Sequence, residues 1–190
     1  MSGHNKWSQI KRKKGVIDEA RAKVFGRLSK IIALESKTAK GDVNSPSLRA
    51  IIEKAKGESM PKENIERAIK NGMGRDHENV EEIVYEAYGP GGAALIIQTI
   101  TGNRNKASAE VKHILSKNDS SLGAIGSAVW AFEKTEGEWR AKTPLLLGRE
   151  EAEKLFVLIE ALEENEEVSE VFTNAEPPEG FSPEEKENKS

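Results

Sequence analysis

The chain has 190 residues and a mass of 20.9 kDa, with 36% hydrophobic residues, 32% charged residues and a formal net charge of −3. It contains no cysteine, which excludes a disulfide framework, a thiolate metal site and a cysteine nucleophile. No apolar stretch approaches the roughly 20 residues that span a bilayer, and the N-terminus lacks the apolar core of a signal peptide. We therefore expect a soluble, cytoplasmic protein of one or two domains without a membrane partner.

The first predicted elements are a basic arm and a long helix. Residues 1–15, MSGHNKWSQIKRKKG, are too polar to fold by themselves and form the arm. Apolar residues at spacings of three and four then predict a helix over residues 16–39. A second face of this helix is basic, because four cations also recur at helical spacing: Lys23, Arg27, Lys30 and Lys37.

Two shorter helices follow. Ser45-Pro46 is a typical helix start, with Ser45 as the N-cap and proline at the first helical position. Pro61 lies in the first turn of a third helix, for which Asn71-Gly72 is a stop signal. We expect these three helices to form a domain over residues 16–75, and residues 74–79 to form a linker.

The periodicity then changes to that of an α/β domain over residues 80–175. Strands are expected at 83–88, 93–101, 127–133, 139–147 and 168–173, with helices at 107–117 and 152–162. The order predicts an α+β fold: an N-terminal three-helix domain followed by a two-layer split-βαβ domain with a largely antiparallel sheet. Residues 176–190 are rich in Pro, Glu, Lys and Ser, and we expect a disordered acidic tail there.

The charge is divided unevenly between the two halves of the chain. Residues 1–75 hold 18 Lys and Arg against 8 Asp and Glu, or +10, whereas residues 76–190 hold 11 against 24, or −13. Such a split indicates that the basic part meets a polyanion. The alternative is that the basic and acidic parts attract each other within the fold.

The sequence assembles no catalytic or cofactor site. The three histidines have no second ligand at a metal-binding spacing. Gly72-Met73-Gly74 follows a helix instead of a strand, which argues against a dinucleotide-binding loop. A Walker A lysine and a Gly-x-Ser-x-Gly motif are both missing. We therefore expect a protein that is not an enzyme and that uses no cofactor, no metal and no small-molecule substrate.

Basic residues carry the strongest chemical signal. Lys11–Lys14, with the sequence KRKK, can neutralise several phosphates, and Trp7 could stack on an exposed base. The basic helix face would extend that track. A second patch, Arg104-Asn105-Lys106, opens a helix, where a guanidinium and a helix N-terminus favour phosphate binding. A capped helix start without a ligand is the alternative for this second patch.

Five segments of the chain resemble the YebC family, which includes the mitochondrial translational activator of cytochrome oxidase. In family order they are MSGHNKWSQIKRKKG, SMPKENIERAIKNGMG, YEAYGPGG, GNRNKASAEVKHILSKNDSSLGAIGSAVWAF and VFTNAE. Family members usually carry an additional α/β domain between the segments that here end at Phe132 and resume near Lys142, an interval that this chain crosses with EKTEGEWRA. The deletion bears on any activity that needs the cleft between two α/β domains. Smaller departures are Gly102, where the family favours an acid, and Ser120-Ser121, where it tends to have Gly.

The resemblance implies a helical domain followed by α/β domains, with no cofactor and no catalytic site. Members are described as probable transcriptional regulators that bind DNA, and others act at the ribosome, where they relieve stalls on sequences such as proline runs. We therefore predict a monomeric, non-enzymatic nucleic-acid-binding regulator of gene expression. The candidate contacts, which include the arm residues carried over from the family, are Lys6, Trp7, Lys11, Arg12, Lys13, Lys14, Lys23, Arg27, Lys30, Arg104 and Lys106.

Three functional hypotheses stay open at this point. The family description favours DNA as the partner. The sequence shows no helix-turn-helix pattern with a distinct recognition helix, which favours ribosomal RNA or the ribosome. Phosphate contacts alone do not decide between these two, because they carry no sequence information. The third hypothesis is an interaction module whose acidic C-terminal half binds a protein.

Overall fold

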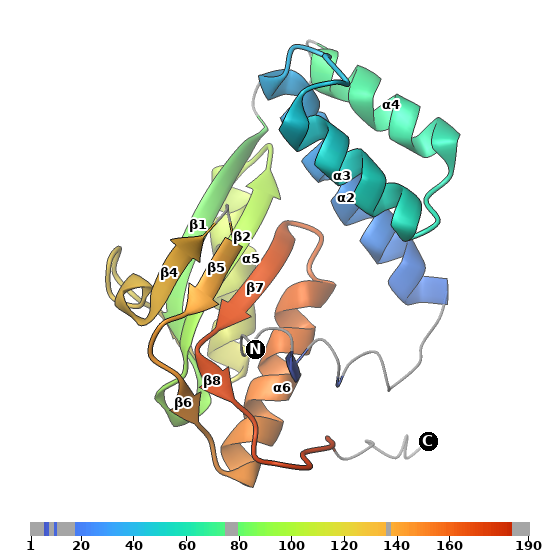
Figure 1. The fold of residues 1–190 in the computed structure, drawn as a ribbon. Helices are drawn as coiled ribbons and strands as arrows, with labels where there is room; N and C mark the ends of the chain where they lie inside the picture. Colours follow the sequence, from blue (N-terminus) through green and yellow to red (C-terminus); the bar gives the residue numbers. More distant parts are fainter. Residues whose placement is uncertain (1–5, 8–9, 11–17, 75–79, 136–137, 184–190) are drawn as a thin grey trace, which may run out of the picture.

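The computed structural model describes residues 6–7, 10, 18–74, 80–135 and 138–183 (Figure 1). Its helices are α2 (Asp18–Thr38), α3 (Pro46–Gly57), α4 (Lys62–Met73), α5 (Arg104–Lys117) and α6 (Arg149–Glu164), with single 3-10 turns η2 (Pro90–Gly92) and η3 (Val129–Ala131). Its strands are β1 (Glu81–Tyr88), β2 (Ala94–Thr101), β3 (Ser121–Leu122), β4 (Phe132–Thr135), β5 (Glu138–Ala141), β6 (Leu145–Leu146), β7 (Val168–Thr173) and β8 (Ala175–Glu176). The fold is α+β, as the sequence predicts. None of the described helices is both long and apolar enough to cross a membrane.

The helices α2, α3 and α4 pack around their own apolar core. Leu28 and Ile32 of α2 meet Leu48 of α3 and Ile65 of α4, all of them buried. The predicted helix starts are confirmed, since α3 begins at Pro46 and α4 directly follows Pro61. In Figure 1 this helical group lies beside one end of the sheet.

Ser45 occupies the N-cap position of α3 as predicted, but its hydroxyl makes no capping hydrogen bond and lies 3.3 Å from the Ser47 hydroxyl. Helix α4 ends at Met73, one residue after the predicted stop signal Asn71-Gly72. Gly72 also has a packing role that was not predicted, because a Cβ there would lie only 2.2 Å from the carbonyl oxygen of Ala33 on α2. Glycine at this position therefore allows α2 and α4 to pack closely.

The main sheet has the order β3-β1-β2-β7, and every pairing in it is antiparallel. Strand β2 is buried on both faces, and its alternating side chains serve two cores. Leu95 and Ile97 join the buried side chains of α5 and α6 on one face. Ala94 and Ile96 point to the other face, which the hairpin of β4 and β5 covers through residues that include Phe132. The predicted antiparallel sheet with both helices on one face is confirmed.

The predicted strands after α5 differ from the observed ones. Of residues 127–133, only the end belongs to a strand, because the Glu86 carboxylate accepts hydrogen bonds from three backbone N–H groups and holds residues 126–129 in turns. The strand predicted over 139–147 is divided into β5 and β6, with Pro144 between them. Strand β3 follows α5 without having been predicted.

The ordered chain also extends beyond residue 175. Strands β6 and β8 pair in parallel, with Leu146 opposite Glu176. Phe181 is buried in the same core as Trp7 from the N-terminal segment. The prediction of a disordered tail is therefore wrong for residues 176–183, which are part of the fold. Residues 184–190 lie outside the described residues.

Candidate nucleic-acid interface

The described part of the arm contacts the α/β domain. The Lys6 ammonium lies 2.5 Å from a carboxylate oxygen of Glu176. The indole of Trp7 is 2% exposed, and its N–H donates a 2.9 Å hydrogen bond to the carbonyl of Ala175. Ile10 packs against the same core. In this structure the Trp7 ring therefore faces the protein interior and is not available for stacking on a base.

The other predicted contacts on the N-terminal side have different environments. Lys11–Lys14, the centre of the predicted arm site, lie outside the described residues. Lys23 and Lys37 are exposed on α2. Arg27 and Lys30, on the same helix, are half-buried and face the α/β domain. On the predicted basic face, Lys23 and Lys37 are thus exposed, whereas Arg27 and Lys30 are half-buried at the junction with the α/β domain.

Arg27 and Lys30 contact the end of α6 and the segment before β7, residues 163–167, which we call the α6–β7 corner. The Arg27 guanidinium donates to the carbonyl of Glu163. The Lys30 ammonium donates to the carbonyl of Glu166 at 2.7 Å. Burial lowers the pKa of Arg27, and the nearby carboxylates of Glu163 and Glu170 oppose this shift.

Arg27 and Lys30 supply positive charge and hydrogen-bond donors at the end of α6. The last turn of α6 carries no basic residue, and a helix C-terminus has a partial negative charge with unpaired carbonyls. Cations from α2, which is far away in the sequence, therefore take the role that a local Lys or Arg plays in other helices.

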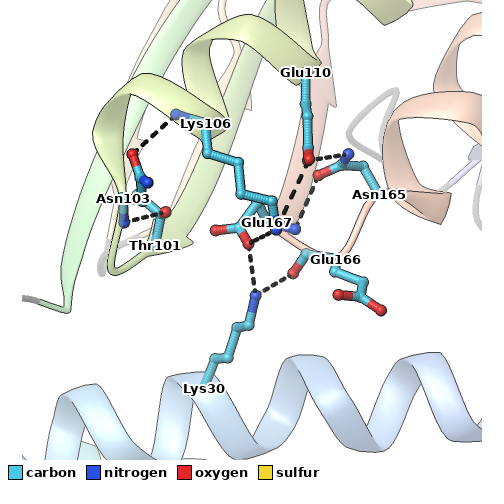
Figure 2. A network of polar contacts seen from close by, with 8 residues as sticks. All are labelled: Lys30, Thr101, Asn103, Lys106, Glu110, Asn165, Glu166 and Glu167. Atoms are coloured by element: carbon cyan, nitrogen blue, oxygen red, sulfur yellow. Dashed lines mark hydrogen bonds and ion pairs between the residues drawn. The ribbon is translucent and has the colours of Figure 1, made fainter. Parts of the chain in front are cut away.

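Glu167 is the centre of the corner, as Figure 2 shows. Its carboxylate is nearly buried and lies 3.2 Å from the Lys106 ammonium and 3.4 Å from the Lys30 ammonium. Burial alone would raise the pKa of Glu167, but hydrogen bonds from Thr101 and Lys106 and the charges of both lysines outweigh it and lower the pKa. One carboxylate thus joins a helical-domain cation to an α/β-domain cation.

Arg104 and Lys106 open α5, as predicted, and both have carboxylate partners. Arg104 holds Glu81 through two nitrogens, at 2.7 and 3.2 Å, and this hydrogen bonding lowers the pKa of Glu81. The Asn103 side chain accepts from the backbone N–H of Lys106 at 3.1 Å, so α5 begins with a capped turn. This patch therefore matches the alternative of a capped helix start.

Three candidate cations from the basic part of the chain contact the acidic part, namely Lys6, Arg27 and Lys30. Arg104 and Lys106 pair with carboxylates of their own part, Glu81 and Glu167. The basic and acidic parts therefore attract each other at three residues, which account for only part of the +10 excess of residues 1–75. Over the residues that the structure describes, no group of three His, Cys, Asp or Glu side chains could hold a metal ion.

Residues 5–75 match a family model described as the TACO1/YebC protein N-terminal domain, and residues 80–137 match one described as the TACO1/YebC second and third domain. The chain belongs to the TACO1/YebC family. The family resemblance places an additional domain between Phe132 and Lys142 in most members. In this chain the β4–β5 hairpin occupies that interval. The backbone N–H of Lys142 returns to the carbonyl of Ala131 at 2.8 Å, which closes this interval locally.

Relatives of this TACO1/YebC chain include bacterial proteins with regulatory names. A probable transcriptional regulatory protein of Desulfosudis oleivorans is 52% identical over 136 residues, which are 70% of this chain and 55% of that protein. One of Geobacter sulfurreducens is 49% identical with the same coverage. The crystal structure of a conserved hypothetical protein from Aquifex aeolicus has a TM-score of 0.80 and 28% identity, covering 89% of this chain and 96% of that one. The chain spans a little over half the length of these regulatory relatives.

Two exposed hydrophobic side chains, Trp130 and Ile125, lie in the part matched by the TACO1/YebC second-and-third-domain model and were not predicted from the sequence. Trp130 is 55% exposed, and its indole N–H donates to the Tyr88 hydroxyl at 3.0 Å. Tyr88 donates in turn to the carbonyl of Ser127. Nearby Ile125 is fully exposed on the turn that Glu86 holds. Their exposure depends on that turn, and no residue spacing in the sequence signals it.

Proposed function

We propose that this chain is a non-enzymatic, nucleic-acid-binding regulator of gene expression that acts on DNA. The observation that carries the proposal is the excess of +10 over residues 1–75, with the uninterrupted basic run Lys11–Lys14. Relatives of the same family are named probable transcriptional regulatory proteins, which supports a regulatory role. Lysine and arginine neutralise phosphates and release counterions, so such a run binds a nucleic-acid backbone.

The surface of the helical domain supports this proposal. All three of its helices carry exposed cations, namely Lys23 and Lys37 on α2, Arg49, Lys54 and Lys56 on α3, and Lys62, Arg67 and Lys70 on α4. Several carboxylates accompany them, including Glu53 beside Lys56 at 2.8 Å. Among the described side chains of these helices, the eight exposed cations exceed the three exposed carboxylates, Glu53, Glu63 and Glu66, and this net positive charge attracts a polyanion.

A ribosome-associated translation factor, which relieves stalling on sequences such as proline runs, is the second candidate. It is favoured by the spread of exposed cations over three helices, because a single recognition helix in the major groove would concentrate its contacts. Contacts spread in this way suit binding by shape and backbone, as in RNA recognition.

The proposal predicts a specific loss when the basic run is removed. Changing Lys11, Arg12, Lys13 and Lys14 to Ala should weaken binding to duplex DNA, single-stranded RNA or ribosomes. The slope of log affinity against log salt should flatten by about 3, since each phosphate contact contributes about 0.9 for duplex and 0.7 for single strands. Binding is measured by fluorescence anisotropy across a salt series, with circular dichroism as the check on folding.

A control variant with the same loss of four charges separates a specific site from diffuse attraction. Arg49, Lys54, Arg67 and Lys70, all exposed on α3 and α4, are changed to Ala for this purpose. A smaller change of slope in the control supports the arm as the site, whereas an unchanged slope in the arm variant on every partner rejects it. Sequencing the nucleic acid that copurifies with the protein decides between the two candidates: recurrent promoter fragments support DNA, and abundant ribosomal RNA supports the ribosome.

A further inference from the structure

We propose that the junction between α2 and the α6–β7 corner is a latch that a nucleic-acid backbone opens. The inference rests on the proposed function and adds a regulation to it. In the closed form, Arg27 and Lys30 are bound to the corner, so they are withheld from the basic face to which they belong. Phosphates compete with the corner for these two cations, and binding separates the helical domain from the α/β domain.

The junction between α2 and the α6–β7 corner is polar. The buried cluster around Leu28 and Leu48 shares no residue with the clusters around Leu95 and Ile96 in the α/β domain. Domain orientation within one chain is mobile by default unless a large apolar interface fixes it. Here hydrogen bonds and ion pairs hold the corner, and each of these exchanges readily for contacts with water or phosphate.

Opening of the junction leaves the buried Glu167 carboxylate with a charged partner. Glu167 is the only buried carboxylate among the described junction residues, and it keeps the Lys106 ammonium at 3.2 Å when Lys30 departs. The carbonyls of Glu163 and Glu166, which accept from Arg27 and Lys30, return to water on opening. Two domain-spanning cations are thus freed without the large penalty of an unpaired buried ion.

The α6–β7 corner is itself strongly acidic. Four of its five residues are glutamates, namely Glu163, Glu164, Glu166 and Glu167. A phosphate chain that follows the exposed Lys23 towards Arg27 and Lys30 meets these carboxylates in the closed form and is repelled. Moving the corner away therefore adds two cations and removes a repulsive surface, and both effects favour the open, bound form.

The test measures domain separation and binding independently. The chain has no cysteine, so Lys54→Cys and Glu133→Cys, both at exposed positions, allow dye labelling and energy transfer between the domains. The latch variant Glu163→Gln, Glu167→Gln and Glu170→Gln removes the carboxylates that face Arg27 and Lys30. The control variant Asp119→Asn, Glu150→Gln and Glu179→Gln changes the net charge equally at exposed positions outside the corner.

In the dye-labelled protein with an unchanged corner, we expect short duplex DNA or single-stranded RNA to lower the efficiency of energy transfer between the domains. The latch variant should show a lower transfer efficiency even without added nucleic acid. It should bind the DNA or RNA roughly 3- to 10-fold more tightly than the control variant does. A variant with only Glu163→Gln and Glu170→Gln keeps buried Glu167 and should show the same effects more weakly, so the test survives if the triple change disturbs folding. Binding without any change in transfer would reject the latch and leave the proposed function standing. A failure of every variant to bind would reject both.

Discussion

The indole of Trp7 joins the N-terminal segment to the core of the α/β domain. Its ring lies 6.4 Å from that of Phe156 and 5.9 Å from that of Phe181, measured between centroids. The hydrogen bond to the Ala175 carbonyl satisfies its only polar group. A residue from the start of the chain thus fills a space between α6 and the C-terminal segment, and its removal would leave a cavity and an unpaired carbonyl.

We predict that Trp7→Ala lowers the free energy of unfolding by about 3–5 kcal/mol, the usual loss for a buried aromatic residue. Trp130→Ala is the matched control, because this ring is 55% exposed, and it should cost less than about 1 kcal/mol. Urea unfolding followed by far-ultraviolet circular dichroism measures both values. A Trp7 that serves mainly to stack on a base would instead leave the stability unchanged.

At the scale of elements, the close approach of α2 and α4 determines the packing of the helical domain. Gly72 faces the backbone of Ala33, and the buried Ser36 hydroxyl donates to the carbonyl of Ile69 at 2.9 Å. A side chain at position 72 would force the two helices apart, because the atom that it meets is a backbone oxygen and cannot rotate away. The interface therefore requires glycine inside a helix, where it is otherwise unfavourable.

We predict that Gly72→Ala destabilises the protein although alanine is the better helix former. Overpacking costs about 1–3 kcal/mol, whereas the gain in helix propensity is at most about 1 kcal/mol. Gly26→Ala in α2 is the control, since a Cβ there meets nothing within 4 Å, and it should raise the stability by about 0.5–1 kcal/mol. Thermal unfolding of both variants measures the opposite signs. Two stabilising changes would mean that α4 can move away from α2 at little cost.

These elements also show what the sequence could and could not predict. Helix starts at Pro46 and Pro61 were predicted correctly, because proline acts through its own ring and its immediate neighbours. The packing role of Gly72 was not predicted, because its constraint comes from Ala33 on another helix. The environments of Trp7 and Lys30 were not predicted for the same reason. Their partners, Ala175 and Glu167 respectively, are more than 130 residues away in the sequence. Composition identified the cations but not the carboxylates that hold them.

At the scale of the whole molecule, a polar junction joins the apolar core of the helical domain to the α/β domain, whose sheet has an apolar core on each face. The helical core surrounds buried Leu48, and the α/β core contains buried Ile97. Lys30 and Arg27 connect them through hydrogen bonds and charge. Cooperativity in folding comes mainly from shared apolar packing, so a junction of this kind transmits little stability from one core to the other.

We predict that the helical domain and the α/β domain open separately in native-state hydrogen exchange. Leu48→Ala and Ile97→Ala each remove a fully buried side chain, and such changes cost about 2–5 kcal/mol. Leu48→Ala should reduce protection of the slowest amides in α2, α3 and α4 while those of β2 and β7 keep theirs, and Ile97→Ala should do the reverse. Each variant thus serves as the control for the other. Equal loss of protection in both domains from either change would mean that the junction couples them into one cooperative unit, because the polar contacts of Arg27 and Lys30 would then transmit the full cost of the cavity.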